Sequence, residues 1–176
     1  MPFHSSKWAL HNYYSRSASL RRYLPPTAIF SRKTLRDYMS RYSSVFIKPD
    51  NEHMGRGVIK AWKEKGRYTF VKEKGSQKHA SSIDQLYKKV RQKSGSTRHI
   101  IQKTIPLAKV HGRRFDIRVM MMRNAAGKWE FAAMLAKVAG KDSIITNVRR
   151  GGGYALKVST ALAPTLSKAQ IERVTK

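Results

Sequence analysis

Apolar residues recur along the chain with two different periods, which predict helices in some segments and strands in others. The helical segments place an apolar residue every three or four positions, and Ser31 and Ser82 are suited to cap two of them. Pro25-Pro26 and Gly95 act as stop signals, and a further helix begins at Ser167. The helices expected before Ser167 are 8–14, 20–24, 31–42 and 82–92.

Short continuous or alternating apolar runs predict the strands, most of them joined as hairpins. One hairpin turns at Lys65-Gly66, and a longer one turns at residues 124–127. The segment 103–112 contains Pro106, so we expect it to continue no sheet. This order of elements predicts an α+β architecture. The expected strands are 45–48, 58–62, 68–72, 99–102, 115–122 and 129–138, and 143–148 is a further apolar run.

Composition adds an extreme positive charge to this picture. The chain of 176 residues carries 37 Lys and Arg against 10 Asp and Glu, which gives a formal net charge of +27 at pH 7. Such a field attracts polyanions, and binding of this kind weakens steeply with salt. No zinc finger or aromatic-rich RNA motif accompanies the charge, so the sequence does not indicate a dedicated nucleic-acid module.

The sequence lacks the signals of a membrane or secreted protein. No apolar run reaches the roughly 18 residues that a membrane helix requires, and the N-terminus has no apolar signal-peptide core. We therefore expect a soluble, cytoplasmic protein without a membrane span. The absence of cysteine excludes disulfides and thiolate metal sites.

The clearest chemistry lies at the end of the strand 45–48 and in the polar loop after it. Pro49 stops the strand after Lys48, and Gly55 and Gly57 allow the backbone to approach a ligand closely. Backbone N–H groups in such a loop form an anion-binding nest, and Lys48 supplies a point charge. We interpret the segment as a triphosphate site, although its spacing is neither the Walker nor the dinucleotide pattern. A hairpin turn with a solvated lysine is the alternative.

Three later segments extend this interpretation when they are taken together with Lys48-Pro49 and the glycine loop 55–57. They are 100–105 (Ile-Ile-Gln-Lys-Thr-Ile), 115–119 (Phe-Asp-Ile-Arg-Val) and 146–152 (Thr-Asn-Val-Arg-Arg-Gly-Gly). In this order and spacing the chain resembles the ATP-grasp superfamily. It is most similar to the YheC/YheD group of endospore coat-associated proteins, and more distantly to ligases that add glutamate to a ribosomal protein. The resemblance runs from about Ser6 to the end of the chain.

The resemblance implies an ATP-grasp fold of the α+β class, with two lobes of antiparallel sheet and helices and the nucleotide between them. We expect residues 1–176 to form a single, truncated ATP-grasp domain. Its approximate lobes are 44–105, from the phosphate loop to the hinge, and 1–43 together with 106–176.

The resemblance also implies roles on the nucleotide side. Lys7 and Lys48 match two phosphate-contacting lysines, and the glycine loop matches a mobile loop that closes over the phosphates. Main-chain groups of the hinge 102–105 would contact the adenine edge. Solvated lysines are the alternatives for Lys7 and Lys137. The implied nucleotide-binding residues are Lys7, Lys48, Met54, Gly55, Gly57, Gln102, Lys103, Ile105, Lys137 and Asn147.

Asp116 and Arg118 alternate on one strand, so both side chains project to the same face. The resemblance implies catalytic roles for Asp116, Arg118 and Arg150, in which an arginine holds an acyl phosphate or a transferring phosphoryl group. Arg149 stays open as an alternative to Arg150. A cross-strand salt bridge is the alternative interpretation of Asp116 and Arg118.

The chain departs from the family pattern at the metal ligands. Members of the family end with an aspartate and a Glu-x-Asn that hold magnesium, whereas the only acid after Gly153 here is Glu172. Because Mg²⁺ requires hard oxygen ligands, we expect this chain alone not to catalyse, and we assign no metal ligand within it. We expect the Mg²⁺ ligands to lie beyond residue 176, and a naturally degenerate relative is the alternative.

These observations predict an ATP-binding protein whose complete form is an ADP-forming ligase. It would join a carboxylate to an amine or a similar nucleophile through an acyl phosphate. The positive charge fits an acidic acceptor and non-specific polyanion binding. The alternative function is a non-catalytic, basic polyanion-binding or spore-coat protein on an ATP-grasp scaffold, and the resemblance adds the spore coat as a location.

Overall fold

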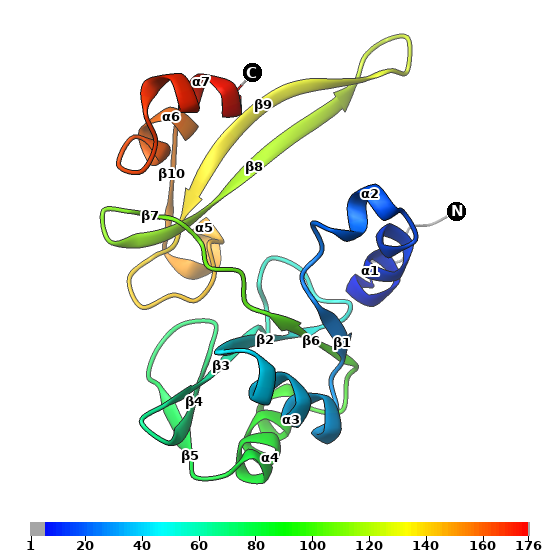
Figure 1. Cartoon of the computed structure of the whole chain (residues 1–176), viewed down its shortest axis with the longest axis vertical. Helices are drawn as coiled ribbons and strands as arrows, with labels where there is room; N and C mark the ends of the chain where they lie inside the picture. Colours follow the sequence, from blue (N-terminus) through cyan, green and yellow to red (C-terminus); the bar gives the residue numbers. More distant parts are fainter. Residues whose placement is uncertain (1–5, 176) are drawn as a thin grey trace. The chain divides into compact units, whose positions relative to one another are not determined.

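The computed structural model describes residues 6–175, which divide into two compact units with a boundary between Ile105 and Pro106 (Figure 1). Each unit combines helices with its own antiparallel sheet, which confirms the predicted α+β class. The boundary differs from the lobes expected from the sequence, because residues 6–43 belong with 44–105 and not with the second unit. The strand 27–29 pairs within the first sheet, and the helix 32–41 contributes to the core beneath it.

The first unit is built on a six-stranded antiparallel sheet in the order β1-β6-β2-β3-β4-β5. The predicted hairpin about Lys65-Gly66 joins β3 to β4, and both turn residues have positive φ. The strand predicted at 45–48 is confirmed and includes Pro49 as its last residue. The bounds are β1 (Thr27–Ile29), β2 (Ser44–Pro49), β3 (Ile59–Glu64), β4 (Arg67–Lys72), β5 (Lys78–Ala80) and β6 (His99–Lys103).

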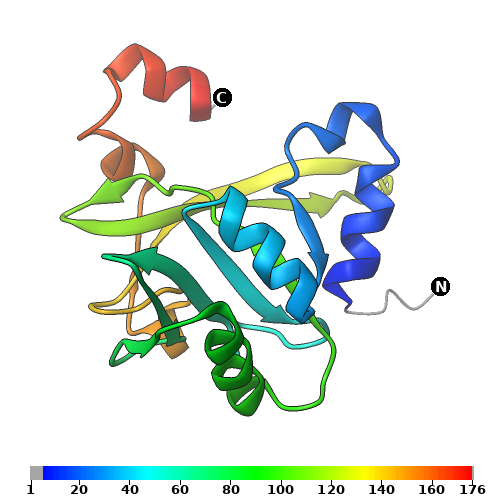
Figure 2. The same cartoon turned by 60° about the horizontal axis from the view of Figure 1, so that its bottom comes forward.

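Helices α3 (Arg32–Arg41) and α4 (Ile83–Ser94) contribute to the core on one face of this sheet, as can be followed in Figure 2. Both are capped as predicted, because the side chains of Ser31 and Ser82 accept hydrogen bonds from backbone N–H groups in the first turn. Val45 and Ile47 of β2 are buried in the same core. Side chains alternate along a strand, so Phe46 and Lys48 project from the opposite face.

The chain before β1 forms α1 (Lys7–Ser15) and the single turn α2 (Ala18–Arg21). The helix expected at 20–24 is therefore shorter and begins earlier. Ser17 is its N-cap, and Leu24 closes a turn onto Arg21 just before the two prolines.

The second unit has a four-stranded antiparallel sheet in the order β10-β9-β8-β7. A core of Val110, Phe115, Val138, Val158 and Leu162 lies between this sheet and the C-terminal helices. The bounds are β7 (Lys109–Val110), β8 (Arg113–Arg123), β9 (Trp129–Val138), α5 (Val148–Gly151), β10 (Tyr154–Leu156), α6 (Val158–Leu162) and α7 (Lys168–Thr175).

The expectation that 103–112 continues no sheet is wrong at its first residue and in its last part, because Lys103 is the end of β6 and β7 pairs with the start of β8. The turn between them uses His111, a non-glycine residue with a φ of 50°, and Gly112. The apolar run 143–148 forms no regular strand, since Ser143 and Ile145 are tied in local turn hydrogen bonds. Neither β10 nor α6 was expected.

The predicted long hairpin of β8 and β9 is confirmed, and its outer half carries an exposed apolar surface. β7 pairs only with residues 113–114 of β8, and β10 pairs only with 136–138 of β9. Beyond these points the hairpin is two strands wide. The exposed apolar residues of this half are Val119, Met120, Met121, Met122, Trp129 and Phe131. Across residues 6–175, no helix has the length and apolarity needed to span a membrane.

Candidate functional site

Lys48 lies on the face of the first sheet opposite α3 and α4, at the end of β2 where the polar loop begins. Its Nζ donates to Oε1 of Gln102 at 2.6 Å, and Nε2 of Gln102 donates to Oγ1 of Thr27 at 2.8 Å. The ammonium also lies 5.4 Å from the ring centroid of Phe46. Burial, reinforced by the charge of Lys7, lowers the pKa of Lys48 to about 8. A desolvated cation of this kind is suited to pair with an anion.

Lys7 fixes the loop that follows β2. Its Nζ donates to the backbone carbonyl oxygens of Pro49 at 2.8 Å, of Asp50 at 3.3 Å, and of Glu52. An ammonium has three protons, so these contacts account for its donors. Burial lowers the pKa of Lys7 despite the opposing charges of Asp50 and Glu52. The structure thus gives Lys7 a role in holding the backbone, and its contact with a phosphate remains a prediction.

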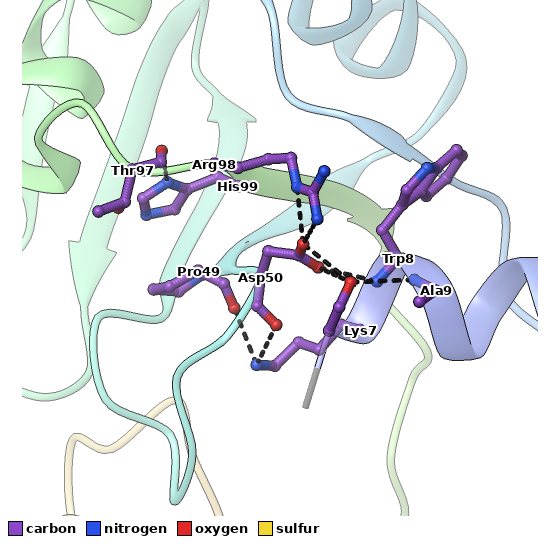
Figure 3. Close-up of polar contacts among 9 residues, drawn as sticks. Lys7, Trp8, Ala9, Pro49, Asp50, Thr97, Arg98 and His99 are labelled. Atoms are coloured by element: carbon purple, nitrogen blue, oxygen red, sulfur yellow. Dashed lines mark hydrogen bonds and ion pairs between the residues drawn. The ribbon is translucent and has the colours of Figure 1, made fainter. Parts of the chain in front are cut away.

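Asp50 is the centre of this arrangement and is a residue that the sequence analysis missed (Figure 3). Its carboxylate is 1% exposed and accepts from Ser6 Oγ at 2.9 and 3.0 Å, from the Trp8 N–H at 2.8 Å and from Arg98 Nε at 2.7 Å. Burial alone would raise the pKa of Asp50, but the hydrogen bonds from Trp8, Ser6 and Arg98 outweigh it and hold the pKa below its ordinary value. Asp50 thereby joins the start of α1 to the loop and to Arg98, the residue before β6.

The sequence offered one signal for Asp50. It is the first acid after Asp37 in a very basic chain, and it directly follows the strand-ending Lys48-Pro49. An acid at that point, surrounded by many cations, is a natural ion-pair partner. The identity of its partners depends on contacts over 42 to 48 residues of sequence, which no local pattern reveals.

The glycine loop passes through several residues with positive φ. Met54, Gly55 and Gly57 have φ values of 54°, 79° and 71°, and Met54 is 61% exposed. A Cβ on Gly57 would lie 2.7 Å from Cγ of Pro49, so a side chain there would require a shift. The N–H of Gly57 donates to Oε1 of Glu73 at 2.5 Å, which ties the loop to the end of β4.

The segment 102–105 continues from β6. The N–H of Lys103 donates to the Pro26 carbonyl at 3.0 Å, and the N–H of Thr104 donates to the Ser44 carbonyl at 3.1 Å. These N–H groups therefore support the sheet, while the side chain of Ile105 is 52% exposed. Contact of the Lys103 or Ile105 backbone with an adenine remains a prediction, and for Lys103 its N–H already has a protein acceptor.

In the second unit, Asp116 and Arg118 project to one face of β8, as predicted. Nε and one terminal nitrogen of Arg118 each donate to a carboxylate oxygen of Asp116 at 2.9 Å, and Thr146 Oγ1 donates to Asp116 at 2.6 Å. The ion pair left open by the sequence exists, but it runs along one strand and not across two. Lys137 lies opposite Asp116 in the β8–β9 register.

Asn147 caps the short helix α5, because its Oδ1 accepts from the N–H of Arg150 at 2.9 Å. Arg149 and Arg150 are both exposed on this turn, so the choice between them stays open. The glycines around the turn allow close backbone packing: a Cβ on Gly140 would lie 2.0 Å from the Gly151 carbonyl oxygen.

The structure thus brings together Lys7, Lys48, Gln102 and the glycine loop in the first unit, and Asp116, Arg118 and Thr146 in the second. Within residues 6–175, no three His, Asp or Glu side chains are grouped so as to hold a metal ion. The donor set described here therefore does not fit a Mg²⁺ cage built by protein oxygens.

Comparison with known proteins identifies similarity along the whole chain. A family model described as "YheC/D like ATP-grasp" matches residues 2–176. The chain is also 28% identical over 153 residues to the endospore coat-associated protein YheD of Bacillus subtilis (strain 168). That alignment covers 84% of this chain and 34% of YheD, so the chain spans about a third of that relative's length.

Proposed function

Since the chain belongs to the YheC/D-like ATP-grasp family, we propose that it binds ATP through the first unit, with Lys48 as the main contact to the phosphates. The observation that carries the proposal is the state of Lys48. It is a largely desolvated cation, oriented by Gln102, at the start of a loop with three consecutive exposed polar residues and two positive-φ glycines. An anion arriving there would replace the lost hydration of the ammonium.

The surrounding residues have distinct roles in this proposal. Lys7 and Asp50 hold the loop in place through its carbonyls and through α1. Met54, Gly55 and Gly57 form the part of the loop that closes over the phosphates. Ile105, at the end of the unit, offers an exposed apolar side chain to a base.

We further propose that the complete protein is an ADP-forming ligase. A substrate carboxylate would attack the γ-phosphorus of ATP, which releases ADP and forms an acyl phosphate. An amine or similar nucleophile would then attack the acyl carbon, which releases phosphate and forms the new bond. Asp116, Arg118 and Arg150 would act near the transferring group, with Lys137 and Asn147 on the nucleotide side. Because the residues described here do not fit a Mg²⁺ cage, no step of this scheme is assigned to a metal.

A second candidate function is a non-catalytic protein that binds polyanions on the same scaffold. The observation that favours it is the formal charge of +27, since a field of that size attracts any acidic polymer. The name of the relative YheD includes association with the endospore coat, so an anionic coat component is one class of polyanion that this function would bind.

Calorimetry with ATP separates the two functions. Lys48→Met should weaken ATP binding by about 1.5–3 kcal/mol, or roughly 10-fold to 150-fold, as expected for loss of a charge-assisted contact. The matched control is Lys33→Met, which removes the same charge from an exposed position on α3. Equal losses in the two variants, with an equally steep decrease in salt, would favour diffuse polyanion binding and exclude the ATP site at Lys48.

A further inference from the structure

Four lysines are among the residues that line one small, open pocket of the first unit. The cavity has a volume of about 170 Å³ and is formed by the end of β4, the turn after it, the start of β5 and the C-terminal end of α4. Phe70, Val71 and Ser76 also line it. The remaining residues of this lysine pocket are Lys72, Lys74, Lys78 and Lys93.

The charges in the lysine pocket are not balanced from within, because none of its lining residues is acidic. Lys72 is held in place by donating to the backbone carbonyl of Lys93 at 3.0 Å, at the end of α4. The pKa of Lys93 is lowered, first by its close contact with Lys78 and the charge of Lys78, then by burial and by the charge of Lys72. The ammonium groups therefore repel one another, and a bound anion would relieve that repulsion.

The lysine pocket is separate from the Lys48 site. The strand register places Ile47, Ile59 and Lys72 side by side on the sheet face that α3 and α4 cover. Side chains alternate along β2, so Lys48 projects from the other face. A ligand at Lys48 and a ligand in the lysine pocket would thus lie on opposite sides of one sheet.

We propose that the lysine pocket binds a phosphate-class oxyanion at a site distinct from the nucleotide site. Several cations favour a multiply charged ion over a singly charged carboxylate, and ammonium and hydroxyl groups donate to its oxygens. The volume far exceeds the roughly 10–15 Å³ that one water needs, so a tetrahedral anion has room. The same chemistry serves free phosphate and a phosphoryl group carried on a longer molecule.

Titration calorimetry at low ionic strength, with inorganic phosphate in one arm and tripolyphosphate in the other, tests this inference. The double variant K78Q/K93Q should bind the preferred anion at least about tenfold more weakly, because two charge-assisted donors are lost. The control K33Q/K88Q makes the same change in net charge at two exposed positions outside the pocket, and it should stay within about twofold of the parent protein. Tighter binding of phosphate indicates a free-ion site, and tighter binding of tripolyphosphate indicates a phosphoryl group on a chain.

Two results would overturn the inference. Equal losses in the two double variants would mean that the general charge field binds the anion. Loss in Lys48→Met together with retention in K78Q/K93Q would mean that the anion occupies the nucleotide site. Folding is checked by thermal melting, where relief of like-charge repulsion should leave K78Q/K93Q at least as stable as the parent protein. The single variant K93Q provides an independent readout with a smaller loss of affinity.

Discussion

Replacing Asp50 with asparagine tests whether one buried carboxylate holds together α1, the loop that follows β2, and Arg98 before β6. The substitution keeps the shape of the side chain but removes its charge and turns one acceptor oxygen into a donor. That amide nitrogen would face the Ser6 hydroxyl, the Trp8 N–H or the Arg98 guanidinium, all of which donate to Asp50 in the native protein. At least one of these donors would lose its acceptor.

The expected magnitude follows from burial. Breaking a fully buried ion pair costs about 3–5 kcal/mol, but the Arg98 side chain is 56% exposed, so water screens part of this interaction. The remaining loss is that of hydrogen bonds to a buried charge, about 1.5–3 kcal/mol each. We therefore expect Asp50→Asn to lower the free energy of unfolding by about 2–4 kcal/mol at pH 7.

Urea denaturation followed by far-UV circular dichroism measures this difference, and Asp84→Asn is the matched control. Asp84 also contacts arginines, Arg32 at 2.7 Å and Arg36 at 3.4 Å, but its side chain is 40% exposed. Its loss should cost at most about 1 kcal/mol. Equal effects of the two substitutions would refute the reasoning, because burial would then not distinguish them.

The pH dependence gives a second check on Asp50. Its pKa is lowered in the folded protein relative to the ordinary value of 3.8. Its stabilising contribution is therefore complete above that value and is lost as the pH falls through the lower, folded-state pKa. The difference between the native protein and Asp50→Asn should be constant from neutral pH to about pH 5 and should shrink below about pH 4.

Three further predictions concern the glycine loop, Lys48 and the second unit. Gly57→Ala should destabilise the first unit by about 1–3 kcal/mol in urea denaturation, since φ is 71° and the new Cβ meets Pro49 at 2.7 Å. The control Gly66→Ala, with a φ of 77° and open space around the new Cβ, should lower the free energy of unfolding by only about 1 kcal/mol. Equal losses in the two variants would show that the Pro49 contact has no role. With the pKa of Lys48 at about 8, ATP affinity measured by calorimetry should be level below that pH and fall above it, and an unchanged affinity at pH 9.5 would contradict a phosphate contact. Arg118→Ala should leave ATP affinity within about twofold of the native value. It should lower the free energy of unfolding by about 1 kcal/mol or less, because the Arg118 side chain is 53% exposed. A globally unfolded variant would show that its ion pair is structural.

The sequence predicted those helices and strands that are determined by residues close to them in the chain. Ser31 and Ser82 cap their helices through side-chain bonds to N–H groups three residues ahead, and such bonds depend only on adjacent sequence. The long hairpin was recognisable because its two strands are strongly apolar and lie on either side of a turn. β7 was missed because a two-residue strand has no period and because Pro106 was taken to exclude the whole segment 103–112 from a sheet.

The candidate site was predictable in part, for a similar reason. Lys48 and the glycines follow one another in the sequence, so their proximity was evident. The role of Lys7 was not, because its three acceptors are carbonyls 42 to 45 residues away. A lysine at the start of a helix has the same local signature whether it contacts solvent, a phosphate or a distant loop.

The outer half of the β8–β9 hairpin exposes three methionines that oxidants can reach. Met120, Met121 and Met122 are 44%, 48% and 64% exposed, whereas Met39 in the first core is 8% exposed. Peroxide converts a thioether to a polar sulfoxide, and accessible sulfur reacts first. Because the three hairpin methionines already face water, their oxidation removes little packing, while oxidation of Met39 would disrupt the core. Oxidation is therefore expected to be tolerated on the hairpin, whereas Met54, which is 61% exposed in the glycine loop, would react as readily at the proposed nucleotide site.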